Sequence, residues 1–161
     1  MVRGRRPASP ATLRARIPRM EDAITTMFRA TFTIEWGDCD EAGIVFYPNS
    51  FYWFDCTFQR LLRARGLSQR DVRKRFGAVT PIVDVHAEFR APARYDDVLD
   101  IDAGVDLVGN RRFRINYRMS CGGRPIGNGY EVRAWALIDA AGAIKGAAVD
   151  SAFLALLRGE N

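Results

Sequence analysis

The sequence contains little histidine and no long apolar run. The first shortage limits the kinds of catalytic and metal site, and the second argues against a membrane span. His86 is the one histidine, so a hydrolase triad could draw on that residue alone, and zinc sites built from several histidines are excluded. The longest apolar stretch, residues 44–58, is interrupted by a proline, an asparagine and an aspartate. A membrane-spanning helix needs about 20 mainly apolar residues. We therefore expect no membrane span, and chemistry that rests on carboxylates and backbone dipoles.

Cysteine is scarce and widely spaced. The three cysteines, Cys39, Cys56 and Cys121, are odd in number and form no CxxC pair. This usage is typical of a reducing compartment, where thiols stay unpaired. It predicts a cytoplasmic protein without a disulfide framework.

The basic excess is confined to one end of the chain. Six of the 24 lysines and arginines lie in residues 1–20, which hold no acidic residue, so the remainder is nearly neutral although the net charge is +5. A nucleic-acid surface normally places basic residues on the folded domain, so we expect no nucleic-acid partner. Residues 1–26 are expected to be a disordered basic extension and residues 27–161 to form one domain. The alternatives are a transit-like presequence and an over-long reading frame that truly starts at Met20 or Met27.

Hydrophobic periodicity predicts one strand, one long helix and a run of further strands. Residues 27–36 alternate apolar with polar or small side chains, as a half-buried strand does. From Pro48, aromatic and leucine side chains recur at helical spacing until Gly66, which predicts a helix of roughly five turns. A short helix over residues 68–76 follows, with a serine N-cap and a stop at Gly77. The other predicted elements are strands over residues 79–89, 98–108, 111–121 and 126–138 and a helix over residues 150–157.

This order of elements predicts an α+β fold with a single core. Four consecutive antiparallel strands and one long aromatic helix can bury their apolar faces together if the sheet curls around the helix. Gly109-Asn110 is a hairpin signal between two of the strands. No internal repeat and no linker indicates a second domain.

Four carboxylates crowd the polar turn between the first strand and the long helix. They belong to Glu35, Asp38, Asp40 and Glu41. An EF-hand calcium loop is excluded, because alanine and asparagine occupy the fifth and twelfth positions counted from Asp38. Two interpretations stay open for Asp38 and Asp40: they cap turns through Asx-type hydrogen bonds, or one of them takes part in chemistry.

The start of the long helix adds a second feature beside these carboxylates. Around Tyr47 and Pro48, the first backbone N–H groups have no partner within the helix, and together with the helix dipole they can polarise a carbonyl oxygen. Asp40 lies seven residues before Tyr47, so its carboxylate could face the same carbonyl carbon. A carboxylate beside an oxyanion site is the minimum apparatus for acyl transfer. Because a thiolate is a good leaving group, this apparatus suits a thioester.

The same region resembles a known enzyme family. The run WGDCDEAGIVFYPN at residues 36–49, followed by WFD at residues 53–55, is similar to the 4-hydroxybenzoyl-CoA thioesterase family of hot-dog-fold enzymes. TPIV at residues 80–83 and YDDVL at residues 95–99 are also similar to that family. The resemblance covers about residues 28–153, and the Gly-Asp-Cys-Asp turn is its most specific part.

The resemblance implies roles for the turn and the helix start. Asp40 is expected to be the catalytic carboxylate, either as a nucleophile that forms an acyl-enzyme anhydride or as a general base on water. The Tyr47 N–H is expected to polarise the thioester carbonyl, and Asp38 to be a structural member of the turn. Thr80 matches a family position near the thioester, although an ordinary strand-start threonine fits its place equally well. Glu41 stands where family members usually carry proline, and we do not expect this change to remove activity.

The resemblance also implies how the substrate is bound. In the hydroxybenzoyl-CoA enzymes, a helix aspartate at the position of Asp55 meets the ring hydroxyl of the acyl group; the alternative is a solvated helix face. Arg111 and Arg112, together with Arg114, are expected to hold the CoA phosphates, with a solvated hairpin tip as the alternative. His86 is expected to be structural.

These features together predict a single hot-dog domain that hydrolyses an aryl-CoA thioester without a metal or redox cofactor. Domains that resemble this one form homodimers or homotetramers, with sites built across the subunit interface, so we expect a homo-oligomer. One alternative is a short-chain aliphatic acyl-CoA thioesterase of the same fold. Another is a non-catalytic acyl-CoA-binding module, which would not need Asp40.

Overall fold

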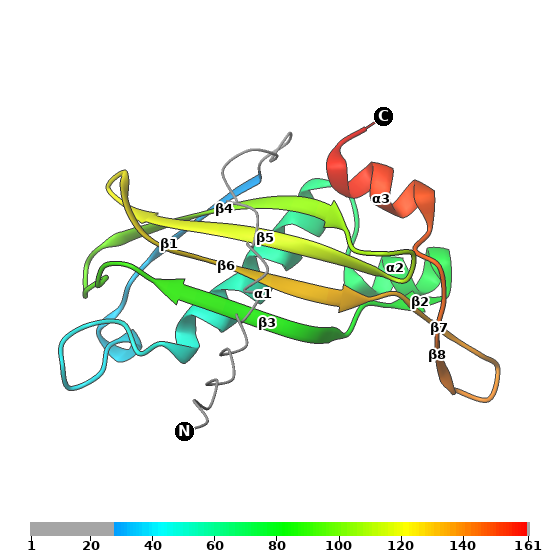
Figure 1. Ribbon diagram of the computed structural model, residues 1–161, viewed down its shortest axis with the longest axis horizontal. Helices are drawn as coiled ribbons and strands as arrows, with labels where there is room; N and C mark the ends of the chain where they lie inside the picture. The colour runs from blue at the N-terminus through cyan, green and yellow to red at the C-terminus, as the bar shows by residue number, and fades with distance from the viewer. Residues whose placement is uncertain (1–27, 161) are drawn as a thin grey trace, which may run out of the picture.

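Residues 28–160, which the computed structural model describes, build a five-stranded antiparallel sheet that curls around one long helix (Figure 1). The strand order is β1-β4-β5-β6-β3. The strands are β1 (Phe28–Thr33), β3 (Ile82–Phe89), β4 (Val98–Leu107), β5 (Arg112–Cys121) and β6 (Arg124–Ala134), and the helix is α1 (Pro48–Ala64). This is the α+β hot-dog arrangement expected from the sequence. The expected extension over residues 1–26 lies outside the described residues.

Helix α1 forms the centre of the core because one of its faces is aromatic and aliphatic. Pro48 occupies the first turn, where its missing N–H costs no helical hydrogen bond. Phe54, Phe58 and Leu62 are fully buried, and burial of each such side chain stabilises the fold by about 1.5–3 kcal/mol. Phe54 stacks on Tyr117 of β5 with ring centroids 4.3 Å apart. The helix and the sheet therefore share one core.

The sheet approaches α1 closely at β6 because a glycine faces the helix there. A side chain at Gly129 would bring its Cβ within 2.6 Å of the Phe54 ring. Gly129 pairs with Tyr117 on β5 and with Ala87 on β3, so this close contact lies in the body of the sheet. The curl of the sheet around α1 thus depends on glycine, which has no side chain, at position 129.

A second, small antiparallel sheet closes one end of the molecule. Its order is β2 (Ala78–Val79), β7 (Ala136–Ile138) and β8 (Ile144–Gly146), and the helices α2 (Gln69–Phe76) and α3 (Ser151–Arg158) precede and follow it in the chain. Phe153 of α3 packs on Trp135 with ring centroids 4.6 Å apart. Figure 1 shows this end at the right, while the loop between β1 and α1 lies at the left.

Two of the predicted strands are interrupted in the structure, and one strand of the small sheet was not predicted. The predicted strand over residues 79–89 is interrupted at Thr80-Pro81, because proline has no N–H to donate to a ladder. The predicted strand over residues 126–138 is interrupted at Trp135, whose N–H donates to the Arg111 carbonyl at 2.9 Å. Strand β8 has no counterpart in the prediction, since three residues are too few for a periodic signal.

The short helix α2 has the ends that its sequence predicts. The Ser68 hydroxyl accepts a hydrogen bond from the Asp71 N–H at 3.2 Å, and the Asp71 carboxylate accepts one from the Ser68 N–H at 2.8 Å. Gly77 ends the helix with a φ of 63°, a left-handed conformation that favours glycine. No helix within residues 28–160 is long and apolar enough to cross a membrane.

Candidate active site

The carboxylate-rich turn folds as a tight hairpin that leads directly into α1. Cys39 and Val45 form an antiparallel bridge, and the Asp40 N–H donates to the Ile44 carbonyl at 2.9 Å. The Asp38 carbonyl accepts hydrogen bonds from the Phe46 N–H at 2.9 Å and from the side-chain amide of helix residue Asn49, also at 2.9 Å. The hairpin is thereby fastened to the first turn of α1.

Each aspartate of the hairpin accepts one backbone hydrogen bond through one carboxylate oxygen, and the two differ in exposure, since Asp38 is half-buried and Asp40 is exposed. Asp38 Oδ2 accepts from the Glu35 N–H at 2.8 Å and caps the short 3₁₀ helix η1 (Trp36–Asp38), which is the structural role expected for it. Asp40 Oδ1 accepts from the Ala42 N–H at 2.8 Å, so the Asx-type contact considered above is present. Within residues 28–160, no donor contacts Asp40 Oδ2, and Asp40 is exposed. The turn therefore orients the carboxylate and leaves one oxygen available.

Helix α1 leaves one backbone donor unused at its start. Pro48 has no N–H. The Asn49 N–H donates to the Phe46 carbonyl at 3.0 Å. The Ser50 N–H donates to the Tyr47 carbonyl at 3.1 Å. The Tyr47 N–H has no acceptor in the described part of the chain, so it is the free backbone donor at the start of α1. It is also the N–H group that the family resemblance implies will polarise the thioester carbonyl.

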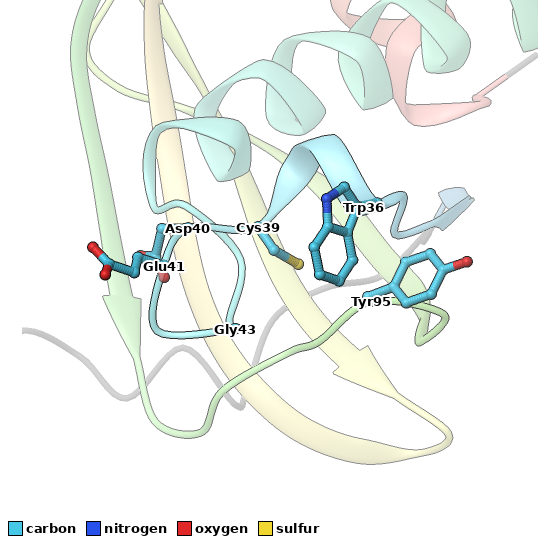
Figure 2. Close-up of a pocket in the computed structure, with 6 residues that line it drawn as sticks. All are labelled: Trp36, Cys39, Asp40, Glu41, Gly43 and Tyr95. Atoms are coloured by element: carbon cyan, nitrogen blue, oxygen red, sulfur yellow. The ribbon is translucent and has the colours of Figure 1, made fainter.

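A shallow depression of about 300 Å³ lies beside the hairpin. Trp36 and Tyr95 form its aromatic wall, with their rings edge to face and their centroids 5.8 Å apart. Figure 2 shows the Cys39 side chain directed toward these rings, while the Asp40 and Glu41 side chains lie on the other side of the loop. Asp40 and Glu41 also line the depression, but their side chains do not point toward its aromatic wall.

Asp55, two turns into α1, has an ion-pair partner that the sequence did not reveal. Its Oδ1 accepts from Arg133 Nη2 at 2.6 Å and from Gln59 Nε2 at 3.2 Å. The Asp55 side chain is 46% exposed, whereas that of Arg133 is 4% exposed. No residue within 28–160 donates to Oδ2 of Asp55. Asp55 is thus a half-exposed helix residue that is paired with a buried guanidinium.

A buried carboxylate holds Arg133 from the other side. Glu131 Oε2 accepts from Arg133 Nη2 at 2.8 Å, from Arg133 Nε at 3.0 Å and from the Tyr117 hydroxyl at 3.0 Å. Burial raises the pKa of Glu131 above its usual value, although the Arg133 guanidinium opposes the shift, and burial also raises the pKa of Tyr117. Among the described residues, Glu131 Oε1 is buried without a hydrogen-bond partner.

Sequence reasoning missed Glu131 and Arg133, although a signal was present. Both residues are charged, and they alternate with apolar neighbours in the predicted strand over residues 126–138. Side chains two residues apart in a strand point to the same face, so the opposite charges had to meet. Their burial beside α1 follows from the fold alone.

Thr80 is joined to Asp55 through the same guanidinium. Arg133 Nη1 donates to the Thr80 carbonyl at 3.2 Å. The Thr80 hydroxyl donates to Gln69 Oε1 at 3.2 Å, and Thr80 is buried. The structure therefore brings two of the expected substrate-binding residues to one place.

Arg111 and Arg112 lie at the opposite end of the sheet from the hairpin. Thr33, which leads into the hairpin region, pairs with Val98 at the start of β4. Arg111 and Arg112 follow the end of β4, ten residues of strand further on, and both are exposed. At about 3.4 Å per residue, this separation is roughly 30 Å. One subunit alone therefore does not bring these arginines to Asp40. In Figure 1 the loop between β1 and α1 lies at the left, whereas β4 ends at the right.

Comparison with known proteins defines the family. A family model described as the thioesterase-like superfamily matches residues 34–156, and the chain belongs to this superfamily. The 4-hydroxybenzoyl-CoA thioesterase of Pseudomonas sp. (strain CBS-3) is 44% identical to it over 71 residues, which make up 43% of this chain and 50% of that protein. The match thus spans half of that relative's length.

A second relative and the solved structure of the first agree with this placement. The 1,4-dihydroxy-2-naphthoyl-CoA hydrolase of Synechococcus elongatus is 29% identical over 94 residues, 58% of this chain and 69% of that protein. The solved structure of the Pseudomonas 4-hydroxybenzoyl-CoA thioesterase superposes with a TM-score of 0.72 at 30% identity, covering 81% of this chain and 98% of that chain. The likeness in structure extends over nearly the whole of that relative and confirms the expected fold.

Proposed function

We propose that this protein hydrolyses an acyl-CoA thioester, with Asp40 and the Tyr47 N–H as its catalytic groups. The observation that carries the proposal is that one short hairpin joins a carboxylate with an unused oxygen to an unpaired N–H at a helix start. The names of the relatives, a thioesterase and a CoA hydrolase, support the same class of reaction.

The chemistry follows from these two groups. The Tyr47 N–H and the α1 dipole stabilise negative charge on the thioester oxygen as its carbon becomes tetrahedral. Asp40 either adds to that carbon, expels the CoA thiolate and forms an anhydride that water cleaves, or takes a proton from the water that attacks. Both routes yield the free acid and CoA, and neither needs a metal or redox cofactor.

The acyl group proposed is an aryl group that carries a hydroxyl. The free Oδ2 of Asp55 can accept a hydrogen bond from a phenol, and a hydrogen bond to a carboxylate is stronger than one between neutral groups. The acyl groups in the names of both relatives carry ring hydroxyls as well. Asp55 would then select the substrate, while Asp40 performs the chemistry.

The complete site is proposed to lie between two copies of the chain, in a homodimer or homotetramer. Arg111 and Arg112 could bind the CoA phosphates of a thioester at Asp40 only from another subunit, because roughly 30 Å separates them along β4 in their own subunit. The edge strand β3 offers a surface for pairing, since Val83, Val85 and Phe89 on it are exposed. Exposed apolar edge strands are typical sites of sheet extension by a second chain.

Release of the CoA thiol from a panel of thioesters tests the proposal. We expect the highest kcat/KM for 4-hydroxybenzoyl-CoA, a lower value for benzoyl-CoA and the lowest for butanoyl-CoA. A preference for butanoyl-CoA would contradict the aryl assignment and favour a short-chain aliphatic thioesterase. Binding of these thioesters without turnover would contradict hydrolysis and indicate a binding module.

A further inference from the structure

A single buried guanidinium connects the parts of the molecule that are proposed to contact the acyl group. Arg133 contacts Asp55 on α1 through Nη2 at 2.6 Å and the Thr80 carbonyl through Nη1 at 3.2 Å. Its Nε and Nη2 both donate to Glu131 Oε2. The plane of the guanidinium is further restrained by the Phe58 ring, whose centroid lies 4.0 Å from Arg133 Cζ.

We propose that Arg133, anchored by Glu131, is a positioning residue that fixes Asp55 for recognition of the acyl hydroxyl. This inference rests on the proposed function, in which Asp55 accepts a hydrogen bond from the substrate. Arg133 occupies Oδ1 of Asp55, and among residues 28–160 no donor contacts Oδ2. The substrate that fits is an acyl group that presents a hydroxyl donor at a fixed distance and direction.

The need for arginine follows from the number and directions of the contacts. The fork of a guanidinium can donate to three acceptors in one plane, and a lysine ammonium on a flexible stem does not reproduce that arrangement. Asp55 lies on α1, Thr80 between β2 and β3, and Glu131 on β6, so Arg133 joins three separate segments of the chain. Without it, the half-exposed carboxylate of Asp55 could rotate between several rotamers.

Glu131 restrains the Arg133 guanidinium in addition to balancing its charge. Its side chain is 1% exposed, and its Oε2 also accepts a hydrogen bond from the buried Tyr117 hydroxyl. A chain of contacts therefore runs from Tyr117 in the core through Glu131 and Arg133 to the half-exposed Asp55. Mutual polarisation along such a buried chain strengthens each of its hydrogen bonds.

The decisive experiment compares wild-type protein with Arg133→Lys in the full chain. The measurement is kcat/KM for 4-hydroxybenzoyl-CoA divided by kcat/KM for benzoyl-CoA. We expect this ratio to fall on the order of tenfold, which corresponds to one hydrogen bond to a charged group, while kcat for benzoyl-CoA changes little. The matched control is Arg60→Lys. Arg60 also stacks on a phenylalanine, Phe32, and donates to a backbone carbonyl, but within residues 28–160 no hydrogen bond or ion pair joins it to Asp55.

A double-mutant cycle separates positioning from a general structural role. If Arg133 acts through Asp55, Arg133→Lys should have no further effect on the ratio in an Asp55→Ala background. An equal loss in both backgrounds would overturn the inference, as would an unchanged ratio in the single variant. In either case the proposed function would stand, because wild type would still hydrolyse and discriminate the two substrates.

A second variant keeps the inference testable if Arg133→Lys does not fold. Glu131→Gln retains the size of the side chain and one acceptor oxygen but removes the charge that anchors Arg133. The ratio should fall in the same direction, and a ratio equal to that of wild type would overturn the inference. Wild-type protein that shows no preference between the two substrates would contradict both the aryl assignment and the role of Arg133.

Discussion

Arg133 on β6 and Asp55 on α1 are 78 residues apart in the chain, and their side chains meet at 2.6 Å. The contact joins a half-exposed carboxylate to a guanidinium that is 4% exposed, and through it to Glu131, which is 1% exposed. The proposed recognition group is therefore anchored in the core, whereas the proposed catalytic group, Asp40, is carried by a surface hairpin. Changes in the core should alter substrate selection without altering the chemical step.

Because the sheet approaches α1 closely at Gly129, one added methyl group at this position should lower the stability of the fold substantially. Gly129→Ala should lower the free energy of unfolding by about 1–3 kcal/mol or more, because the new Cβ overlaps both the His86 carbonyl oxygen of β3 and the Phe54 ring of α1. Gly146→Ala is the matched control, since a Cβ at that strand glycine meets nothing within 4 Å. Urea denaturation of both variants measures the difference. Equal stability of the two variants would show that the sheet can move away from α1 at no cost.

The raised pKa of Glu131 predicts a specific pH dependence of stability. Burial makes the folded protein hold this proton more tightly than the unfolded chain, in which the pKa lies near 4.5. The stabilisation from protonated Glu131 is fully present below about pH 4.5 and is lost as the pH rises through the raised pKa. Glutamine does not titrate, so the stability of Glu131→Gln relative to wild type should increase as the pH rises above about 4.5, by at most about 1.4 kcal/mol per pH unit.

Denaturation curves of wild type and Glu131→Gln at several pH values provide the measurement. Titrating groups that do not interact with Glu131 contribute equally to both proteins and cancel in the difference. A difference that stays constant with pH, or that falls as the pH rises, would contradict the shift assigned to Glu131.

Periodicity and turn chemistry were sufficient to predict the main elements from the sequence. The aromatic face of α1 and the capped ends of α2 are local signals, since each depends on residues a few positions apart. The small second sheet was missed because its strands are two or three residues long and pair only after the chain has folded back. The break at Thr80-Pro81 could have been predicted from the proline alone.

The candidate site was predictable only where its residues are close in sequence. Asp40 and Tyr47 belong to one hairpin, so their relation to the helix start could be inferred. The partner of Asp55 could not, because Arg133 reaches it from a distant strand whose register the sequence does not show. The distance between the hairpin and Arg111 likewise depends on strand pairing and emerged only from the fold.

The proposed position of the site between subunits predicts complementation. Asp40→Asn alone, and the double variant Arg111→Ala with Arg112→Ala alone, should both be impaired. A mixed dimer formed by co-expression contains one site in which intact Asp40 meets intact arginines and one site that lacks both, so purified mixed dimers should recover roughly half of the wild-type rate. Rates of purified mixed oligomers, isolated with two different tags, measure this. No recovery would show that the arginines do not complete the site of another subunit.

The central claim is that the Asp40 carboxylate performs the hydrolysis, and one comparison of variants tests it most directly. Asp40→Asn keeps an Oδ1 acceptor for the Ala42 N–H, so the hairpin should remain intact while the nucleophile or base is lost. Glu41→Gln removes the same charge one residue further on and serves as the control. On the best substrate of the panel, single-turnover and steady-state rates should fall by about 10²–10⁴ for Asp40→Asn and change little for Glu41→Gln, with circular dichroism unchanged. A folded Asp40→Asn protein that keeps more than about a tenth of the wild-type rate would contradict the account, because general acid–base groups contribute far more than that.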